Sequence, residues 1–256
     1  MAMQKISALV VVELKKMWRD PMNMAVMLLM PVGLALIFYF SLSGIYNDYY
    51  PVPGMNHFEY LLPGVMGYAV IYMGMMVALA LVEYRNTGLL MRVEVTPVST
   101  ATYLGSQIVA NMIIATFQGL IVLLVARILG YVPLGGLAGL LLAVVFLAVL
   151  GVTAVGLGLI TAAIAKDTGA ASGIAAIFIV PMMMFGALLA VFDETTRTIA
   201  RFTPNYYVSD SLSIIFQQGS LSAPALWQNL AILAGVTLLV VTLGIGLFAK
   251  TKTANS

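Results

Sequence analysis

The sequence contains no cysteine, and charged residues of either sign are scarce. Of its 256 residues, only 9% are charged, whereas 62% are hydrophobic. The absence of cysteine excludes disulfide bonds, thiolate zinc sites and cysteine nucleophiles from the chain. A soluble domain typically carries about a quarter charged residues, because its exterior needs polar cover. A lipid bilayer removes that requirement, so the composition predicts an integral membrane protein.

Ionisable residues are nearly absent from the long apolar runs. Such residues commonly mark a proton pathway in membrane proteins, so a proton-coupled carrier is disfavoured, whereas sodium coupling through backbone carbonyls stays open. The only histidine, His57, lies between two runs and no aspartate lies inside one, which argues against an intramembrane protease. There is no glycine-rich loop followed by Lys and Ser/Thr that could hold ATP. The net charge of +2 is too small to suggest nucleic-acid binding.

Six apolar runs are long enough to cross a bilayer as helices, which takes roughly 20 residues. They lie at residues 22–42, 60–82, 105–130, 135–165, 169–192 and 226–249. The fourth run is long for one span and too short for two, so we expect one tilted or broken helix, loosened near Gly151, Gly156 and Gly158. The predicted fold is an all-α integral membrane protein in which residues 1–256 form a single transmembrane domain.

Lysine and arginine near the span ends predict the orientation of the chain. With the N-terminus in the cytoplasm, nine of these residues fall on the cytoplasmic side and three on the opposite side. The cytoplasmic set is Lys5, Lys15, Lys16, Arg19, Arg85, Arg92, Lys166, Lys250 and Lys252, and the outer set is Arg127, Arg197 and Arg201. The pattern predicts a multi-pass protein of the cell membrane with both termini in the cytoplasm.

Residues 1–20 are predicted to form an amphipathic helix at the cytoplasmic interface. Its apolar face carries Ile6, Leu9, Val10, Leu14 and Met17. The basic and aromatic residues Lys15, Lys16, Trp18 and Arg19 would lie near lipid headgroups. The alternative is a basic flank that only fixes the topology.

Residues 83–104 are predicted to form a cytoplasmic loop with a short helix. The stretch is too charged to enter lipid and too apolar for a plain solvated loop. As a helix it would present Leu89, Leu90 and Val93 along one side, and Thr96-Pro97 would end it. Such a helix suits docking of another protein, and the alternative is a helix packed on its own bundle.

Residues 193–225 form a long outer segment that is apolar in places but nowhere long enough to span. We expect an outer re-entrant helical hairpin before the last span, with an ordinary globular loop as the alternative. Within the spans, Gly135/Gly139 and Gly169/Gly173 have the four-residue spacing that lets helices approach closely. The many methionines suit packing, and a flexible methionine surface could also accept varied apolar substrates.

Short motifs along the chain occur in a fixed order. They are Leu62-Pro63-Gly64, Glu83-Tyr84-Arg85-Asn86-Thr87-Gly88, Thr96-Pro97 and Tyr103-Leu104-Gly105, followed by Pro181 to Gly186 and Thr203-Pro204-Asn205-Tyr206. In their order and spacing these motifs resemble the ABC-2-type transporter permease family, the membrane subunits of ABC exporters. The resemblance covers nearly the whole chain.

The resemblance implies a non-catalytic transport subunit that holds no cofactor and no metal. It would pair with a second permease subunit, as a homo- or heterodimer, and bind a cytoplasmic ABC ATPase subunit that holds ATP and magnesium. Residues 1–20 would be the connecting helix. The ATPase contacts would come from Glu83, Arg85, Gly88, Arg92, Glu94 and Pro97, and the outer re-entrant region would include Pro181, Gly186, Pro204 and Tyr206.

Three functional classes therefore remain from the sequence. The first is a permease that exports a drug, a lipid or another amphiphile. The second is an ATP-independent secondary carrier or channel, which buried charge or paired broken helices would mark. The third is a membrane assembly or scaffold protein without transport.

Overall fold

The computed structural model describes residues 2–46, 53–88, 99–185 and 194–253, and within these ranges the chain is helical without strands. The helices are α1 (Ala2–Arg19), α2 (Pro21–Leu42), α3 (His57–Asn86), α5 (Thr100–Ile128), α6 (Gly136–Ile164), α7 (Thr168–Met183), α8 (Glu194–Ala200), α9 (Pro204–Phe216) and α10 (Pro224–Thr253). The prediction of an all-α fold is confirmed for this part of the chain.

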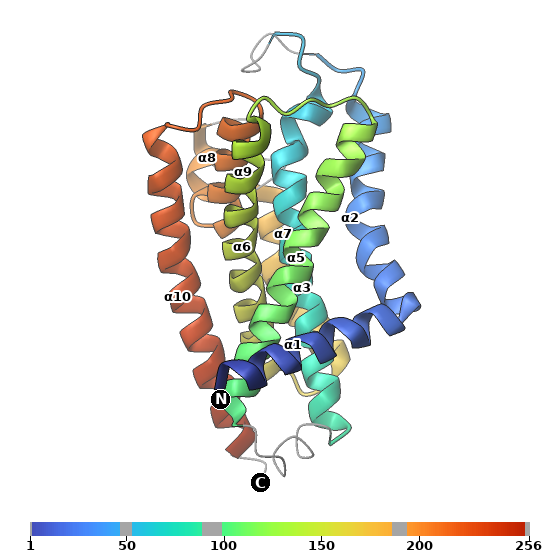
Figure 1. The fold of residues 1–256 in the computed structure, drawn as a ribbon, viewed down its shortest axis with the longest axis vertical. Helices are drawn as coiled ribbons and strands as arrows, with labels where there is room; N and C mark the ends of the chain where they lie inside the picture. The colour runs from blue at the N-terminus through green and yellow to red at the C-terminus, as the bar shows by residue number, and fades with distance from the viewer. Residues whose placement is uncertain (1, 47–52, 89–98, 186–193, 254–256) are drawn as a thin grey trace.

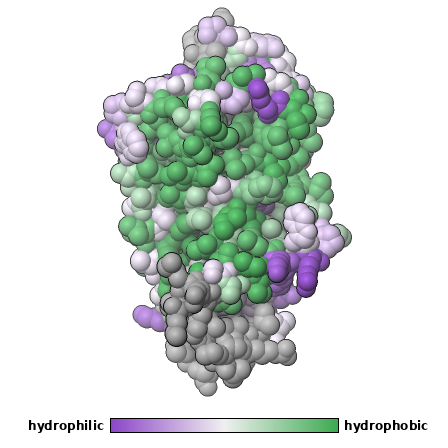
Figure 2. All heavy atoms as spheres, viewed as in Figure 1, coloured by the Kyte–Doolittle hydropathy of each residue, from purple (hydrophilic) through white to green (hydrophobic). Residues whose placement is uncertain are grey.

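The long helices α2, α3, α5, α6 and α10 run along the length of the molecule, while α1 lies across one end (Figure 1). The start of α1, the end of α3, the start of α5 and the end of α10 all lie at this end, which we call the terminal end. The turn between α5 and α6 lies at the opposite end. Figure 2 shows hydrophobic residues over the middle of the visible face and polar residues toward both ends.

Within the described residues, five helices are long and apolar enough to cross a membrane. They cover Met24–Leu42, His57–Asn86, Thr102–Ile128, Gly136–Ile164 and Pro224–Lys250. The remaining predicted span, 169–192, is described only in part, because α7 has 16 residues and residues 186–193 lie outside the described ranges. The sixth span therefore stays a prediction.

The fourth run forms one continuous helix, so the alternative of a broken helix is wrong. Its glycines are points of close contact instead. A Cβ atom at Gly158 would lie 2.6 Å from the carbonyl oxygen of Gly74 in α3, and one at Gly244 in α10 would lie 2.7 Å from that of Gly156. In lipid, helix association depends on such close van der Waals contact, because lipid tails are as apolar as the side chains.

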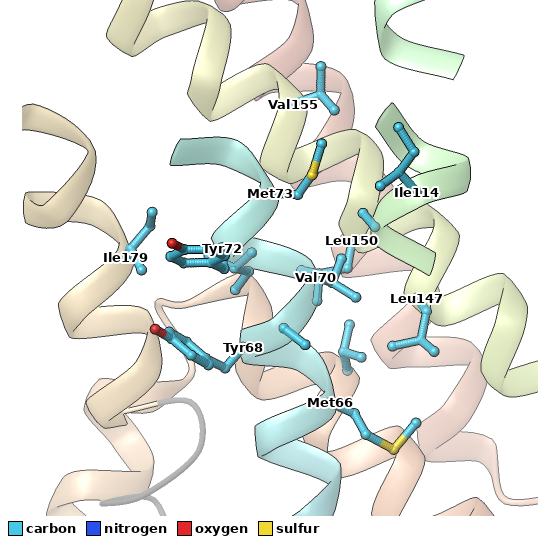
Figure 3. Close-up of a cluster of buried hydrophobic side chains, with 14 of the residues drawn as sticks. Met66, Tyr68, Val70, Tyr72, Met73, Ile114, Leu147, Leu150, Val155 and Ile179 are labelled. Carbon is cyan, nitrogen blue, oxygen red and sulfur yellow. The ribbon is translucent and has the colours of Figure 1, made fainter. Parts of the chain in front are cut away.

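Helix α6 is therefore the axis on which α3 and α10 pack. Figure 3 shows Val70 and Met73 of α3 facing Leu147, Leu150 and Val155 of α6, in a cluster of buried side chains. On the α10 side, the hydroxyls of Thr153 and Thr237 lie 2.7 Å apart and form a hydrogen bond within the buried interface. The contacts of α6 on two sides hold the three helices as one unit.

Two of the three prolines inside described helices, Pro31 and Pro63, leave backbone carbonyls that a glutamine side chain then satisfies. Pro31 has no N–H to donate to the carbonyl of Met27, and Pro63 has none for that of Glu59. Gln118 of α5 donates its side-chain amide to the Met27 carbonyl at 2.9 Å. Gln217, at the end of α9, donates to the Glu59 carbonyl, also at 2.9 Å. Each glutamine supplies the donor that the proline lacks and joins two helices.

Substitution Gly74→Ala should destabilise the bundle. The added Cβ would lie 2.6 Å from the carbonyl oxygen of Ala154, so α3 and α6 must move apart. Overpacking of this kind costs roughly 1–3 kcal/mol. We expect a lower unfolding midpoint for the purified variant in detergent.

Gly246→Ala is the matched control, because it also places alanine in an apolar helix but nothing lies within 4 Å of the added atom. Its midpoint should stay equal or rise, since alanine favours the helix over glycine. Equal midpoints for the two variants would contradict the close contact between α3 and α6.

Candidate functional site

At the terminal end, α1 is fixed to the bundle by a polar contact at the end of α3. The ammonium group of Lys16 donates a hydrogen bond to the hydroxyl of Tyr84 and lies 3.9 Å from the centroid of its ring. The Tyr84 hydroxyl in turn donates to Glu13 at 3.4 Å. Leu14 and Met17 pack against the core from the same helix. The predicted apolar face of α1 is thus at least partly covered by the protein itself.

The predicted interfacial residues lie in the last turns of α1. Lys15, Lys16, Trp18 and Arg19 are all exposed, and the Trp18 side chain is 75% exposed. Their exposure suits a position among lipid headgroups. The contact of Lys16 with Tyr84 was not predicted, because the two residues are 68 positions apart in the chain.

Arg85 ties the end of α3 to the end of α6. Its guanidinium donates to the carbonyls of Ala162 (3.0 Å), Lys166 (3.3 Å) and Ala165. The last carbonyls of a helix lack partners within the helix and carry partial negative charge, so a cation there stabilises the helix end. Arg85 therefore positions the turn between α6 and α7, a role that no pattern in the sequence indicates.

Of the other predicted coupling residues, two lie in the described part of the chain and three do not. Gly88 has φ +72°, a left-handed conformation that follows the last turn of α3 and suits glycine. Glu83 lies on α3 one turn earlier and is exposed. Arg92, Glu94 and Pro97 lie outside the described residues.

A cavity of about 370 Å³ opens beside these residues, between α1, α2, α3 and α5. One part of its wall is polar, with Glu13, Lys16, Glu83 and Tyr84. The other part is apolar and includes Met27 and the α3 methionines. The full lining is Glu13, Lys16, Met17, Asp20, Met27, Met73, Met76, Val77, Leu79, Ala80, Leu81, Glu83, Tyr84, Gln107, Asn111 and Ile114. The volume falls in the range of small-molecule sites.

At the opposite end, α8 and α9 form two short helices in the segment predicted to be re-entrant. Pro204 begins α9, and the Tyr206 ring contacts the edge of the Tyr207 ring at 5.5 Å between centroids. Pro181 lies within α7, whereas Gly186 lies outside the described residues. Whether this hairpin re-enters the bilayer stays a prediction.

Helix α9 runs from inside the bundle to its outer end. Asn205, near its start, is fully buried, with its amide oxygen against Gly67 and its amide nitrogen 3.3 Å from the carbonyl of Met182. Gly67 is ten residues into α3, or about 15 Å along the helix axis. The carbonyl of Phe216, at the other end of α9, accepts from Leu134 in the α5–α6 turn at 2.8 Å.

Polar contacts also join α9 to α10. The amide nitrogen of Asn229 donates to the carboxylate of Asp210 at 2.8 Å and to the hydroxyl of Ser211 at 3.1 Å.

In the α5–α6 turn, burial raises the pKa of the Tyr131 phenol, with a smaller effect from the charge of Glu59, so this group stays neutral. Among the described residues, no group of three or more His, Asp or Glu side chains is placed to hold a metal ion.

Substitution Arg85→Gln should loosen the α6–α7 turn without unfolding the bundle. The three carbonyls at the end of α6 lose a charged donor, and a hydrogen bond to a charged group contributes about 1.5–3 kcal/mol. We expect backbone amides of residues 165–170 to exchange hydrogen about tenfold faster, measured by mass spectrometry. Lys15→Gln, which removes an exposed cation at the same end, should leave this exchange unchanged, and equal effects of the two variants would argue against the positioning role.

A model of a known protein family matches most of the chain described above. The family model described as "ABC-2 type transporter" matches residues 4–216, from the start of α1 to the end of α9. No curated protein matches the chain. The matched part includes Tyr84 and Arg85 at the terminal end and the outer helix α9, but not α10. The chain belongs to the ABC-2 type transporter family, whose members are membrane components that work with an ABC ATPase.

Proposed function

We propose that this chain is the membrane-spanning subunit of an ATP-driven exporter. Its family membership over residues 4–216 is the observation that carries the proposal. The sequence has no phosphate-binding loop, so ATP and magnesium would be held by a separate ATPase subunit. A second permease subunit would complete the transporter, and its cargo would be a drug, a lipid or another amphiphile.

The end of α3 is the proposed point of coupling to the ATPase. Tyr84 contacts α1 through Lys16, and Arg85 contacts the end of α6. A displacement of residues 83–97 by the ATPase would therefore act on α1 and on the α6–α7 turn together. Such a displacement changes transport only if these contacts differ between two states of the permease.

The terminal end is proposed to face the cytoplasm. Among described side chains, Lys15, Lys16, Arg19, Arg85, Lys166 and Lys250 belong to this end, and Arg127, Arg197 and Arg201 to the other. The excess of cations on one side is the pattern of cytoplasmic loops. A protein of the cell membrane with both termini inside follows from this orientation.

Purification from native membranes in mild detergent, followed by an ATPase assay, tests the proposed function. An ATP-hydrolysing subunit should co-elute with this chain. Charge reversal Arg92→Glu should reduce co-elution or uncouple hydrolysis from export. The control Arg201→Glu reverses an exposed charge at the opposite end and should retain both. A chain that reproducibly elutes without any nucleotide-binding protein would favour the ATP-independent carrier.

The absence of cysteine permits a direct test of orientation, because a single introduced cysteine has no background. Ser222→Cys lies in the exposed turn before α10, and Lys166→Cys in the exposed turn between α6 and α7. In intact cells, a membrane-impermeant maleimide should label Ser222→Cys, and it should label Lys166→Cys only after permeabilisation. Labelling in the reverse order would place the terminal end outside.

A further inference from the structure

The cavity at the terminal end combines a charged part with an apolar part along one direction. Its α3 wall runs from Met73 to Tyr84, which is about 16 Å along the helix. Glu83 and Tyr84 lie at the end of α3 beside α1, whereas Met73 lies deeper in the bundle. The shape therefore matches a molecule with a polar head at the membrane interface and an apolar body inserted between helices.

The charged part of the cavity is predominantly negative. Glu13, Asp20 and Glu83 contribute three carboxylates, and Lys16 contributes one ammonium group. Lys16 and Glu13 both contact the Tyr84 hydroxyl, and the three carboxylates still outnumber the one ammonium group. An anionic head would meet this excess of carboxylates, whereas a cationic head would be attracted to it.

A polar side chain on α5 also lines the cavity. Asn111 lines it and is only 7% exposed, a polar side chain within an otherwise apolar run. Its amide nitrogen donates to the backbone carbonyl of Gln107 at 2.8 Å and to that residue's side-chain oxygen at 3.2 Å. Asn111 therefore adds a polar group to the apolar part of the cavity wall.

Methionines form much of the apolar part. Met17, Met27, Met73 and Met76 come from three different helices and meet at the cavity. Methionine side chains are unbranched and polarisable, and they adapt to apolar groups of varied shape. Their contacts with a ligand would select for an apolar body without fixing its exact structure.

We propose that this cavity binds an amphiphile with a single cationic head, such as an ammonium or phosphonium group, and an apolar body. The head lies near Glu13 and Asp20, and the body lies against the methionines. The claim that this amphiphile is the transported substrate rests on the proposed function, whereas the claim that the cavity binds it does not. An ammonium group occurs in lipophilic cations and also, beside a phosphate, in the head of phosphatidylethanolamine.

Tetraphenylphosphonium and tetraphenylborate are suitable probes, since they have nearly the same shape and opposite charge. Binding of each to the purified full chain in a neutral detergent is measured by equilibrium dialysis. We expect the cation to bind at least tenfold more tightly than the anion. The double variant Glu13→Gln/Asp20→Asn should weaken binding of the cation by about tenfold, as expected from the loss of two nearby charges.

Both substitutions lie on exposed or half-exposed positions of α1 and its end, and glutamine at position 13 can still accept the hydrogen bond from Tyr84, so we expect an unfolding midpoint in detergent equal to that of the unmodified chain. Asp167→Asn is the control: it removes a carboxylate at the terminal end that does not line the cavity, and asparagine replaces aspartate equally well at the start of a helix. Its binding of the cation should match that of the unmodified chain. Equal binding of the two probes, or an unchanged affinity in the double variant, would overturn the proposal.

Competition in nanodiscs distinguishes the two sources of the ligand. Displacement of the probe by phosphatidylethanolamine, but not by phosphatidylglycerol, supports a lipid with an ammonium head. Displacement by neither lipid supports a lipophilic cation from solution. An ATPase that co-purifies with a chain that does not bind the cation would refute this inference alone, and cation binding without any ATPase would refute only the exporter.

Discussion

A backbone carbonyl inside an apolar medium needs a hydrogen-bond partner from the protein, and this constraint accounts for much of how the helices are joined. Pro31 and Pro63 each remove one such partner from their own helix. The replacements come from Gln118 and Gln217, which belong to other elements. Each proline therefore does more than bend a helix, because it creates an acceptor that a neighbouring element must occupy. For Gln217 that element is the end of α9, so the position of the outer helix depends on a proline in α3.

Close contact between backbones is the second determinant of the fold. Gly74 and Gly158 bring α3 against α6, and Gly156 and Gly244 bring α10 against α6. Since lipid offers no hydrophobic gain for helix association, such contacts supply the attraction between helices. The described cavity lies where α1 and α2 meet α3 and α5, and Val77 belongs to both regions, because it lines the cavity and its Cβ lies 3.0 Å from a Cβ built at Gly158. The glycine-packed helices thus form a frame, and one side of α3 in that frame is part of the cavity wall.

Apolar run lengths predicted five of the spans, because a bilayer sets the length of a helix independently of its neighbours. The prediction that glycines loosen the helix of the fourth run is wrong, since only the tertiary structure shows which backbone each glycine faces. The partners of the polar residues were also beyond the sequence. Gln118 lies 91 positions from Met27, and Arg85 lies 77 from Ala162. The sequence does show a glutamine within one apolar run and a proline within another. Neither residue, however, shows which glutamine meets which backbone carbonyl.

The end of α3 connects the proposed coupling loop to the cavity by helix geometry alone. Tyr84 and Arg85 are consecutive, so their side chains point about 100° apart around the helix. Tyr84 consequently reaches α1 and lines the cavity, while Arg85 reaches the end of α6. Glu83 adds a carboxylate to the same cavity wall. A force on the loop that follows α3 would change the cavity wall and the α6–α7 turn in the same movement. In the proposed exporter, the residues that receive the motion of the ATPase thus also shape the place where an amphiphile would first bind.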